Sequence, residues 1–305
     1  MRKKIIALAA GLAVAATVLA ADAGTSTAAF LKIGVGARAA GMGDAAAALA
    51  EGPEALYWNP GGLATLERRN VSFTHNEWLT DVRYEYLGVS YPFLNVGAFG
   101  FAAGRVSMGE LTGRDEQGNY TGDFGASDML LSLGYARRLW PILALGAGAE
   151  YVSSKIENES AGTFAGMLGA TVTPPVPGLT AGVSAGHLGG KMTFIDEGDP
   201  LPMALRAGAA YRLPFGGEVH KVTLAVDGVK FRDTDVYVNS GAEYWIYDTV
   251  AVRAGYKARY DEEGITAGLG FKYDTTQTLT FGADYAYGDL GVFGSAQRIS
   301  VGILF

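Results

Sequence analysis

The chain has 305 residues and no cysteine, only 18% of its residues are charged, and it contains 44 glycines, 16 tyrosines and 14 phenylalanines. The missing cysteines exclude disulfides, thiolate metal sites and cysteine nucleophiles. A net charge of −7, with no basic cluster beyond the N-terminus, argues against a nucleic-acid partner. This composition favours a β-barrel over a soluble α/β enzyme.

The first 23 residues have the pattern of a secretory signal peptide. Basic residues at positions 2 to 4 precede an apolar run from Ile5 to Ala21, and Ala21-Asp22-Ala23 offers a cleavage site of small residues. An uncleaved membrane helix is the alternative, but it requires about 20 apolar residues and weaker small-residue flanks. We therefore expect Sec-type export, cleavage, and a mature chain that begins at Gly24.

Residues 24–69 lack the alternation of a strand and are too long for a simple tail. Asp44 can cap a short helix over residues 45–50, which Gly52 and Pro53 would end. A rigid turn is predicted next, at Trp58-Asn59-Pro60-Gly61-Gly62-Leu63. Because the segment is compact and apolar, we expect it to fold as a plug, or hatch, inside a lumen and to close it. The turn at residues 58–63 then either gates the lumen or has only a structural role, seating the plug during assembly.

From residue 70 onward apolar and polar residues alternate, which is the period of a strand with two different faces. In the last stretch, Ile299, Val301 and Ile303 interleave with Ser300 and Gly302. Strands are predicted near residues 70–79, 82–92, 95–105, 125–138, 142–155, 162–173, 178–188, 202–213, 218–230, 236–247, 249–260, 264–274, 277–288 and 295–305. Fourteen strands of about 9–11 residues or more predict an all-β membrane protein, an antiparallel transmembrane β-barrel over residues 70–305.

The connections between the predicted strands alternate in length. Short turns fall at residues 139–141 and 247–249, whereas residues 106–124 and 188–201 form long connections with charges and glycines. Outer-membrane barrels show this asymmetry, with short periplasmic turns and long extracellular loops.

Charged residues inside the predicted strands decide which face points to lipid. A lysine or arginine on the lipid face costs roughly 2–4 kcal/mol near the midplane, so these side chains belong in the lumen. The lumen candidates are Arg206, Arg212, Glu243, Arg253, Lys257, Arg259, Lys272 and Asp284, with Glu150 inward elsewhere. They form either a ladder of stabilising ion pairs or a site where Arg253 or Lys257 meets a ligand carboxylate.

Residues 24–64 resemble the start of PorV/PorQ-type outer-membrane proteins of the FadL-like family. The resemblance lies in the runs Gly24-Thr25-Ser26, Ala29 to Ala39, Gly41 to Ala45 and Tyr57 to Ala64. The last run is similar to the family's Asn-Pro-Ala box, with Gly61 where alanine is usual. The resemblance implies a fourteen-stranded barrel with an N-terminal hatch, and the terminal Phe305 resembles the signal read by the barrel-assembly machinery.

Two functions follow from this resemblance. FadL-like members carry hydrophobic compounds across the outer membrane, and PorV-like members bind the sorting domains of proteins exported by type IX secretion. We expect a hatch-gated transport barrel for small, hydrophobic compounds, with the secretion role as the alternative. A structural or adhesive barrel with a blocked lumen is a third interpretation. The expected partners are outer-membrane lipid, the barrel-assembly machinery, and a hydrophobic ligand or secretion-system proteins.

Other motifs do not favour an enzyme, a cofactor or a metal. Gly34-x-Gly36-x-x-Ala39 imitates a dinucleotide fingerprint but no βαβ unit follows it, so packing in the hatch explains it better. Asp115 and Asp123 could hold calcium in a loop, but the glutamate that ends an EF-hand loop is missing. No activated nucleophile is recognisable, and we therefore expect no catalytic residue.

Overall fold

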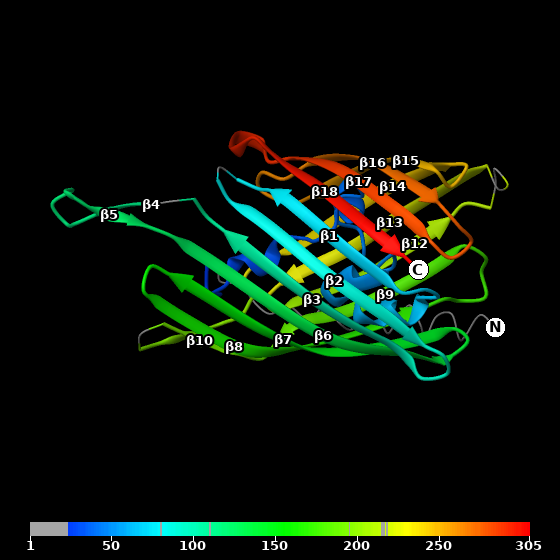
Figure 1. The fold of residues 1–305 in the computed structure, drawn as a ribbon, viewed down its shortest axis with the longest axis horizontal. Helices are drawn as coiled ribbons and strands as arrows, with labels where there is room; N and C mark the ends of the chain where they lie inside the picture. The colour runs from blue at the N-terminus through cyan, green and yellow to red at the C-terminus, as the bar shows by residue number, and fades with distance from the viewer. Residues whose placement is uncertain (1–23, 80, 110, 195, 215–216, 218) are drawn as a thin grey trace.

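The computed structural model describes residues 24–305 except positions 80, 110, 195, 215–216 and 218. The expected signal peptide, residues 1–23, lies outside the described residues. Within the described part, fourteen antiparallel strands form one closed barrel (Figure 1). Its strands are β1 (Asn70–Glu77), β2 (Arg83–Phe93), β3 (Gly97–Ser107), β6 (Ala126–Trp140), β7 (Leu143–Ile156), β8 (Glu159–Val172), β9 (Leu179–Leu188), β12 (Ala204–Arg212), β13 (His220–Phe231), β14 (Val236–Ile246), β15 (Val250–Ala258), β16 (Ile265–Asp274), β17 (Thr280–Asp289) and β18 (Ser295–Leu304).

The barrel closes between its first and last strands. Asn70 lies opposite Leu304, and β1 also pairs with β2, so no strand of the barrel has a free edge. The main chain of Phe305 extends this closure by exchanging two hydrogen bonds with Arg69. The predicted fold class is confirmed, and the predicted strand limits agree with the observed ones to within about three residues.

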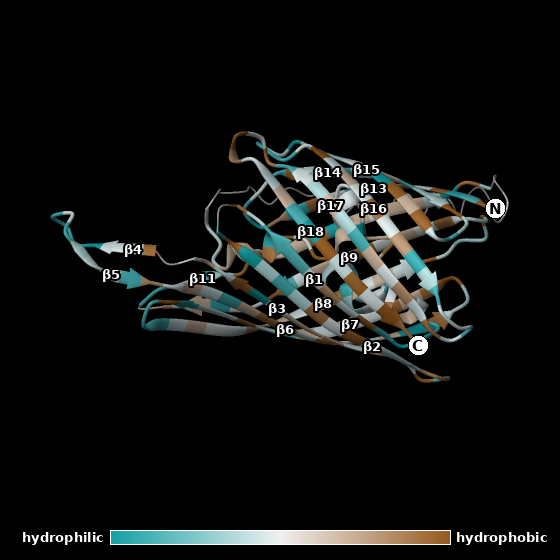
Figure 2. Cartoon of the chain, turned by 45° about the horizontal axis from the view of Figure 1, so that its top comes forward, coloured by the Kyte–Doolittle hydropathy of each residue, from teal (hydrophilic) through white to brown (hydrophobic). Residues whose placement is uncertain are grey.

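The two faces of the wall differ as the alternation requires. In β16, Leu269 and Phe271 are 55% and 49% exposed on the outside of the barrel, whereas Gly270 between them faces the lumen beside Arg253. Hydrophobic and hydrophilic residues alternate along the other strands as well (Figure 2), and the exposed large apolar side chains include Phe101, Leu133 and Ile299. Arg253 on β15 points inward and is buried. No helix among the described residues is long and apolar enough to cross a membrane.

The two ends of the barrel differ in their connections. At one end, which we call the turn end, residues 141–142 and 247–249 form short turns, and both Asn70 and Phe305 lie there. At the opposite loop end, two small hairpins project that the sequence did not predict (Figure 1). They are β4 (Leu111–Arg114) with β5 (Tyr120–Phe124), and β10 (Lys191–Thr193) with β11 (Gly198–Pro200).

The hatch, residues 24–69, lies inside the barrel. It is built from η2 (Ala29–Lys32), α2 (Ala37–Gly41), η3 (Gly52–Glu54), α3 (Ala55–Trp58) and η4 (Pro60–Thr65); η5 (Gly291–Phe293) lies in a loop at the loop end. The predicted helix over residues 45–50 is wrong, because these residues form turns. Asp44 adopts a φ of 61°, and its carboxylate pairs with Lys257 rather than capping backbone amides.

A ring of glycines on the inner wall receives the hatch. On nine strands, a Cβ added to the glycine would lie 3.1 Å or less from a hatch atom. These are Gly88, Gly100, Gly134, Gly146, Gly169, Gly182, Gly241, Gly255 and Gly268. The missing side chains let backbone and side-chain atoms of the hatch approach the wall directly, so the plug and the barrel pack closely against each other there.

Candidate functional site

Asn59 joins the hatch to the barrel wall. Its side chain is fully buried, and its Nδ2 donates to the carbonyl oxygens of Ala47 (2.8 Å) and Ala170 (3.0 Å). Its Oδ1 accepts from the backbone N–H of Gly61 (3.0 Å) and so caps η4. One amide therefore links two parts of the hatch and strand β8, and the tight turn predicted at residues 58–63 is built around it.

Trp58 directly precedes Asn59 and is buried between the hatch and the wall. Its indole is 4% exposed and donates from Nε1 to the carbonyl oxygen of Val35 (2.9 Å). Its own carbonyl accepts from Ser184 on β9 (2.6 Å), and its ring meets Tyr57 edge-on at 4.8 Å between centroids. These contacts hold the indole in one orientation.

A cavity of about 170 Å³ opens on the loop-end side of Trp58, and we call it the outer cavity. Its walls combine aromatic rings with charged groups. Arg206, Lys257 and Lys32 are its cations and Asp44 and Glu263 its carboxylates. The rings belong to Tyr57, Trp58, Phe231, Tyr237 and Tyr260. A concave, largely aromatic site with a few polar groups is the usual form of a small-molecule site.

A second cavity, of about 240 Å³, lies at the rim of the loop end. It shares Tyr237, Tyr260 and Glu263 with the outer cavity, the carboxylates of Asp261 and Glu262 also line it, and apolar or aromatic side chains complete it. These are Trp78, Leu79, Leu290 and Phe293. The shared residues make the two cavities neighbours, so an apolar solute at the rim has a short path inward.

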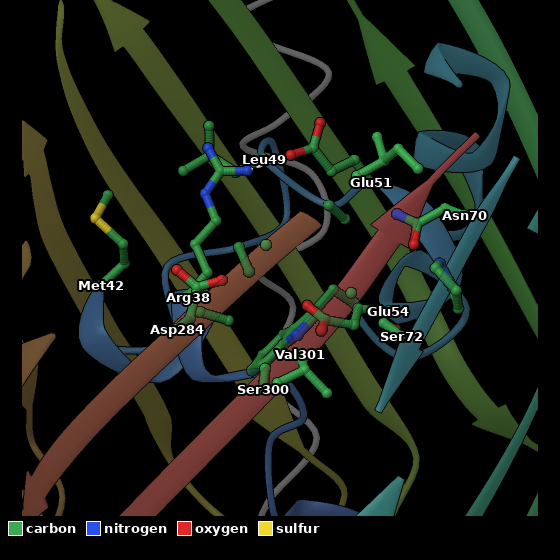
Figure 3. A pocket seen from close by; sticks show the side chains of 18 of the residues that line it. Arg38, Met42, Leu49, Glu51, Glu54, Asn70, Ser72, Asp284, Ser300 and Val301 are labelled. Carbon is green, nitrogen blue, oxygen red and sulfur yellow. Dashed lines mark hydrogen bonds and ion pairs between the residues drawn. The ribbon is translucent and has the colours of Figure 1, made fainter. Parts of the chain in front are cut away.

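On the turn-end side of Trp58 lies an inner cavity of about 150 Å³ (Figure 3). Arg38, Glu51, Glu54 and Asp284 line it, and Trp58 contributes to both this cavity and the outer one. Burial, together with the repulsion of Asp284, raises the pKa of the Glu54 carboxyl to about 7. The hatch thus separates two cavities, and Trp58 is part of the partition.

An ion-pair network crosses from the hatch to the wall. Arg253 on β15 pairs through Nε with Glu243 (2.7 Å) and through a terminal nitrogen with Asp284 (2.6 Å). Arg38 of the hatch donates to the same Glu243 (2.9 Å). Lys257 bridges Asp44 of the hatch and Glu263 beyond β15. These residues are consistent with the ion-pair ladder considered from the sequence, which now includes the hatch.

The remaining lumen candidates are dispersed. Arg212 and Lys272 lie at the turn end, Arg212 exposed and Lys272 half-buried. Glu150 pairs with His187 at 3.0 Å inside the wall. Arg259 does not enter the lumen: β15 ends at Ala258, and Arg259 is exposed in the following loop with a φ of 71°. Its assignment from the alternation is corrected, because the strand ends one residue earlier.

Several residues of the site were not identified from the sequence. Arg38, Asp44 and Glu54 reach their partners only through the folding of the hatch, and no local pattern marks those partners. Phe231, Tyr237 and Tyr260 lie at strand ends, where alternation carries little information. Only their aromatic side chains, close to predicted loops, could have indicated that they belong to a binding site.

A closed barrel of fourteen antiparallel strands, with the N-terminal segment folded inside, is the architecture of FadL-like outer-membrane barrels. No protein-family model matches the chain, and no curated protein matches it. Solved structures do match in fold. The monoaromatic hydrocarbon channel CymD aligns with a TM-score of 0.58 and 15% identity, over 89% of this chain and 97% of its own.

Two further structures align over the same 89% of the chain. The toluene transporter TbuX of Ralstonia pickettii has a TM-score of 0.57 and 16% identity, with 97% of its chain covered. A FadL homologue of Pseudomonas aeruginosa has a TM-score of 0.51 and 13% identity, with 98% covered. At these identities the similarity establishes a common fold.

Proposed function

We propose that the protein is an outer-membrane channel for small hydrophobic compounds, entered from the loop end and gated by the hatch. The observation that carries the proposal is the pair of cavities that share Trp58. A solute in the aromatic outer cavity is separated from the inner cavity by the hatch segment around this indole. The three fold relatives named above, two of them described as a hydrocarbon channel and a toluene transporter, support the same class.

Placement in the membrane supports the proposal. The outer surface carries apolar side chains such as Leu133 and Phe101, and the charges of Arg253 and Glu243 are inside. A closed barrel resists detergent, so the protein should migrate differently on a gel before and after boiling. Deleting Phe305, which pairs with Arg69, should reduce the heat-modifiable fraction sharply. Identical mobility together with recovery in a soluble fraction would contradict the outer-membrane assignment.

Gating requires that the hatch move when solute arrives, which shifts a population rather than opening a fixed pore. Uptake of labelled toluene by cells that produce the protein tests this. Replacing Trp58 by alanine removes the shared partition and should increase uptake, while Trp140, exposed at the turn end, serves as the control. Unchanged uptake in a Trp58→Ala barrel that remains heat-modifiable would contradict a gate at this position.

The secretion role remains the second candidate, because the matched residues of the hatch are common to both groups. The β4–β5 hairpin, which projects beyond the barrel and exposes Leu111 and Tyr120, offers a surface for a protein partner (Figure 1). Purification from outer membranes separates the candidates. Co-purified secretion machinery supports the secretion role, and bound apolar compound supports the channel.

A further inference from the structure

Arg206 of β12 is buried in an unusual environment for a cation. Its side chain lies over three rings of the outer cavity, with the guanidinium carbon 4.7 Å from the centroid of Tyr57, 5.3 Å from Trp58 and 5.8 Å from Phe231. Only 3% of the residue is exposed. It makes one long hydrogen bond, to the carbonyl oxygen of Tyr57 (3.3 Å). The cation–π contacts stabilise the charge but use none of its remaining donors.

Some N–H donors of the Arg206 guanidinium are not used in hydrogen bonds. Its Nε and one terminal nitrogen have no hydrogen-bond partner among the residues that the structure describes. No carboxylate of this described part lies within ion-pair distance of Arg206. Buried donors are nearly always paired in folded proteins, so an orphaned arginine beside a cavity indicates a missing acceptor.

The other two cations of the outer cavity are already neutralised. Lys32 binds Asp233 at 2.7 Å, and Lys257 binds both Asp44 and Glu263. A new anion at either lysine would lie next to a carboxylate that already neutralises the ammonium group, and that carboxylate would repel it. At Arg206 it would meet a free planar fork, which matches the two oxygens of a carboxylate.

The size and walls of the cavity restrict the rest of the ligand. Engineered cavities of about 150 Å³ hold one benzene ring, and the outer cavity has about 170 Å³. Tyr237 and Tyr260 stack on each other at 3.9 Å between centroids and form a flat wall. One aromatic ring with a small substituent fits this space, and its faces and edges find aromatic partners.

We propose that the outer cavity binds monoaromatic carboxylates, with the carboxylate on Arg206 and the ring among the aromatic side chains. The inference deepens the proposed channel function by naming a substrate class, and it rests on that function for its physiological meaning. The guanidinium exchanges its long bond to Tyr57 for two charge-assisted hydrogen bonds to the ligand. Neutral hydrocarbons fit the same space but leave the donors of Arg206 unpaired.

Calorimetric titration of the full-length mature protein in detergent tests the proposal. Benzoate should bind wild-type protein about tenfold or more tightly than the neutral isostere benzamide, because a hydrogen bond to a charged group is stronger than one between neutral groups. Octanoate, with the same headgroup on a flexible chain, should also bind about tenfold more weakly than benzoate, because its chain must be ordered on binding. Equal affinity for benzoate and benzamide would overturn the proposal without any variant, and equal affinity for octanoate would overturn its aromatic part.

Variants assign the binding to Arg206. Arg206→Met should weaken benzoate binding by about tenfold to a hundredfold and should change toluene binding far less, because toluene makes no hydrogen bond to the guanidinium. Toluene binding also shows that the variant retains its cavity, and Arg206→Lys, which keeps the charge but loses the fork, should be intermediate. The matched control is Arg212→Met, an arginine of the same strand that is exposed at the turn end and does not line the outer cavity, and it should change benzoate affinity less than about threefold. Full benzoate affinity in Arg206→Met would overturn the assignment.

Uptake measurements separate this inference from the channel function. Toluene uptake without preferential benzoate binding would support the proposed channel function and contradict the proposed carboxylate site. Benzoate binding that depends on Arg206, without uptake of any solute, would support the proposed carboxylate site and contradict the proposed channel function.

Discussion

Replacing Asn59 by alanine should release the hatch without opening the barrel wall. The change removes two donations from Nδ2, to Ala47 and Ala170, and the acceptor that caps η4 at Gly61. A lost cap costs about 1 kcal/mol, and each buried hydrogen bond contributes about 1 kcal/mol more. The hatch should therefore lose about 2–4 kcal/mol of its seating free energy.

This loss should appear as local opening of the hatch. The lost hydrogen bonds lie within the hatch and at its contact with β8, whereas the hydrogen bonds that pair the strands are unchanged. A difference of 2–4 kcal/mol raises the open population by about 30-fold to several hundredfold, since about 1.4 kcal/mol corresponds to a factor of ten. Hydrogen exchange of the amides in residues 55–65 reports this population directly. The strand amides and the heat-modifiable mobility should stay as in the wild type.

Asn59→Asp is the matched control, because it keeps the cap acceptor but sets a carboxylate against two carbonyl oxygens. It should open the hatch at least as much as the alanine variant. The reasoning is refuted if exchange in residues 55–65 is unchanged in Asn59→Ala, or if the strand amides exchange faster to the same degree. The first result would mean that Asn59 does not hold the hatch, and the second that hatch and wall unfold together.

Three further changes test other contacts. Gly61→Ala places a Cβ 2.9 Å from the backbone of β8 and should increase protease cleavage of the hatch, although alanine is usual at this position in the family that the sequence resembles. The pKa of the Glu54 carboxyl is about 7 in the seated hatch and about 4.5 when the carboxyl is in water, so between these pH values the seated hatch holds a proton that a released one gives up. Protease protection of the hatch should therefore fall as the pH rises from about 4.5 to about 7 and level off above that, and Glu54→Gln should abolish this dependence. Arg253→Met leaves the buried Glu243 with one cation fewer and should destabilise the barrel to urea by about 3–5 kcal/mol, part of which a second change, Glu243→Gln, restores.

The barrel could be predicted from the sequence because each strand is specified by a pattern within its own residues. Alternation with a period of two marks each strand and both of its faces, so the fourteen strands and the inward position of Arg253 follow from the sequence alone. Where the alternation stops, this local information ends. Arg259 lies one residue beyond β15, and the β4–β5 hairpin is built from charged and glycine-rich residues that resemble a loop.

The hatch could be predicted only in outline, because its conformation depends on contacts distant in sequence. Asp44 has the local features of a helix cap, but the pairing with Lys257, more than 200 residues away, determines its position. Asn59 and Pro60 marked a turn correctly, since their geometry is intrinsic. That Asn59 also bonds β8 was not visible, because nothing near Ala170 identifies it as a partner.

The glycine ring has a consequence for the way the protein is assembled. A strand with glycine at mid-height has little to pack with in an empty lumen, so the wall is weakest where the hatch would seat. The narrowest part of the pore is therefore made by the inserted segment and not by the strands. We expect the strands to close around the N-terminal segment during assembly. A barrel made without this segment should be wider and less stable.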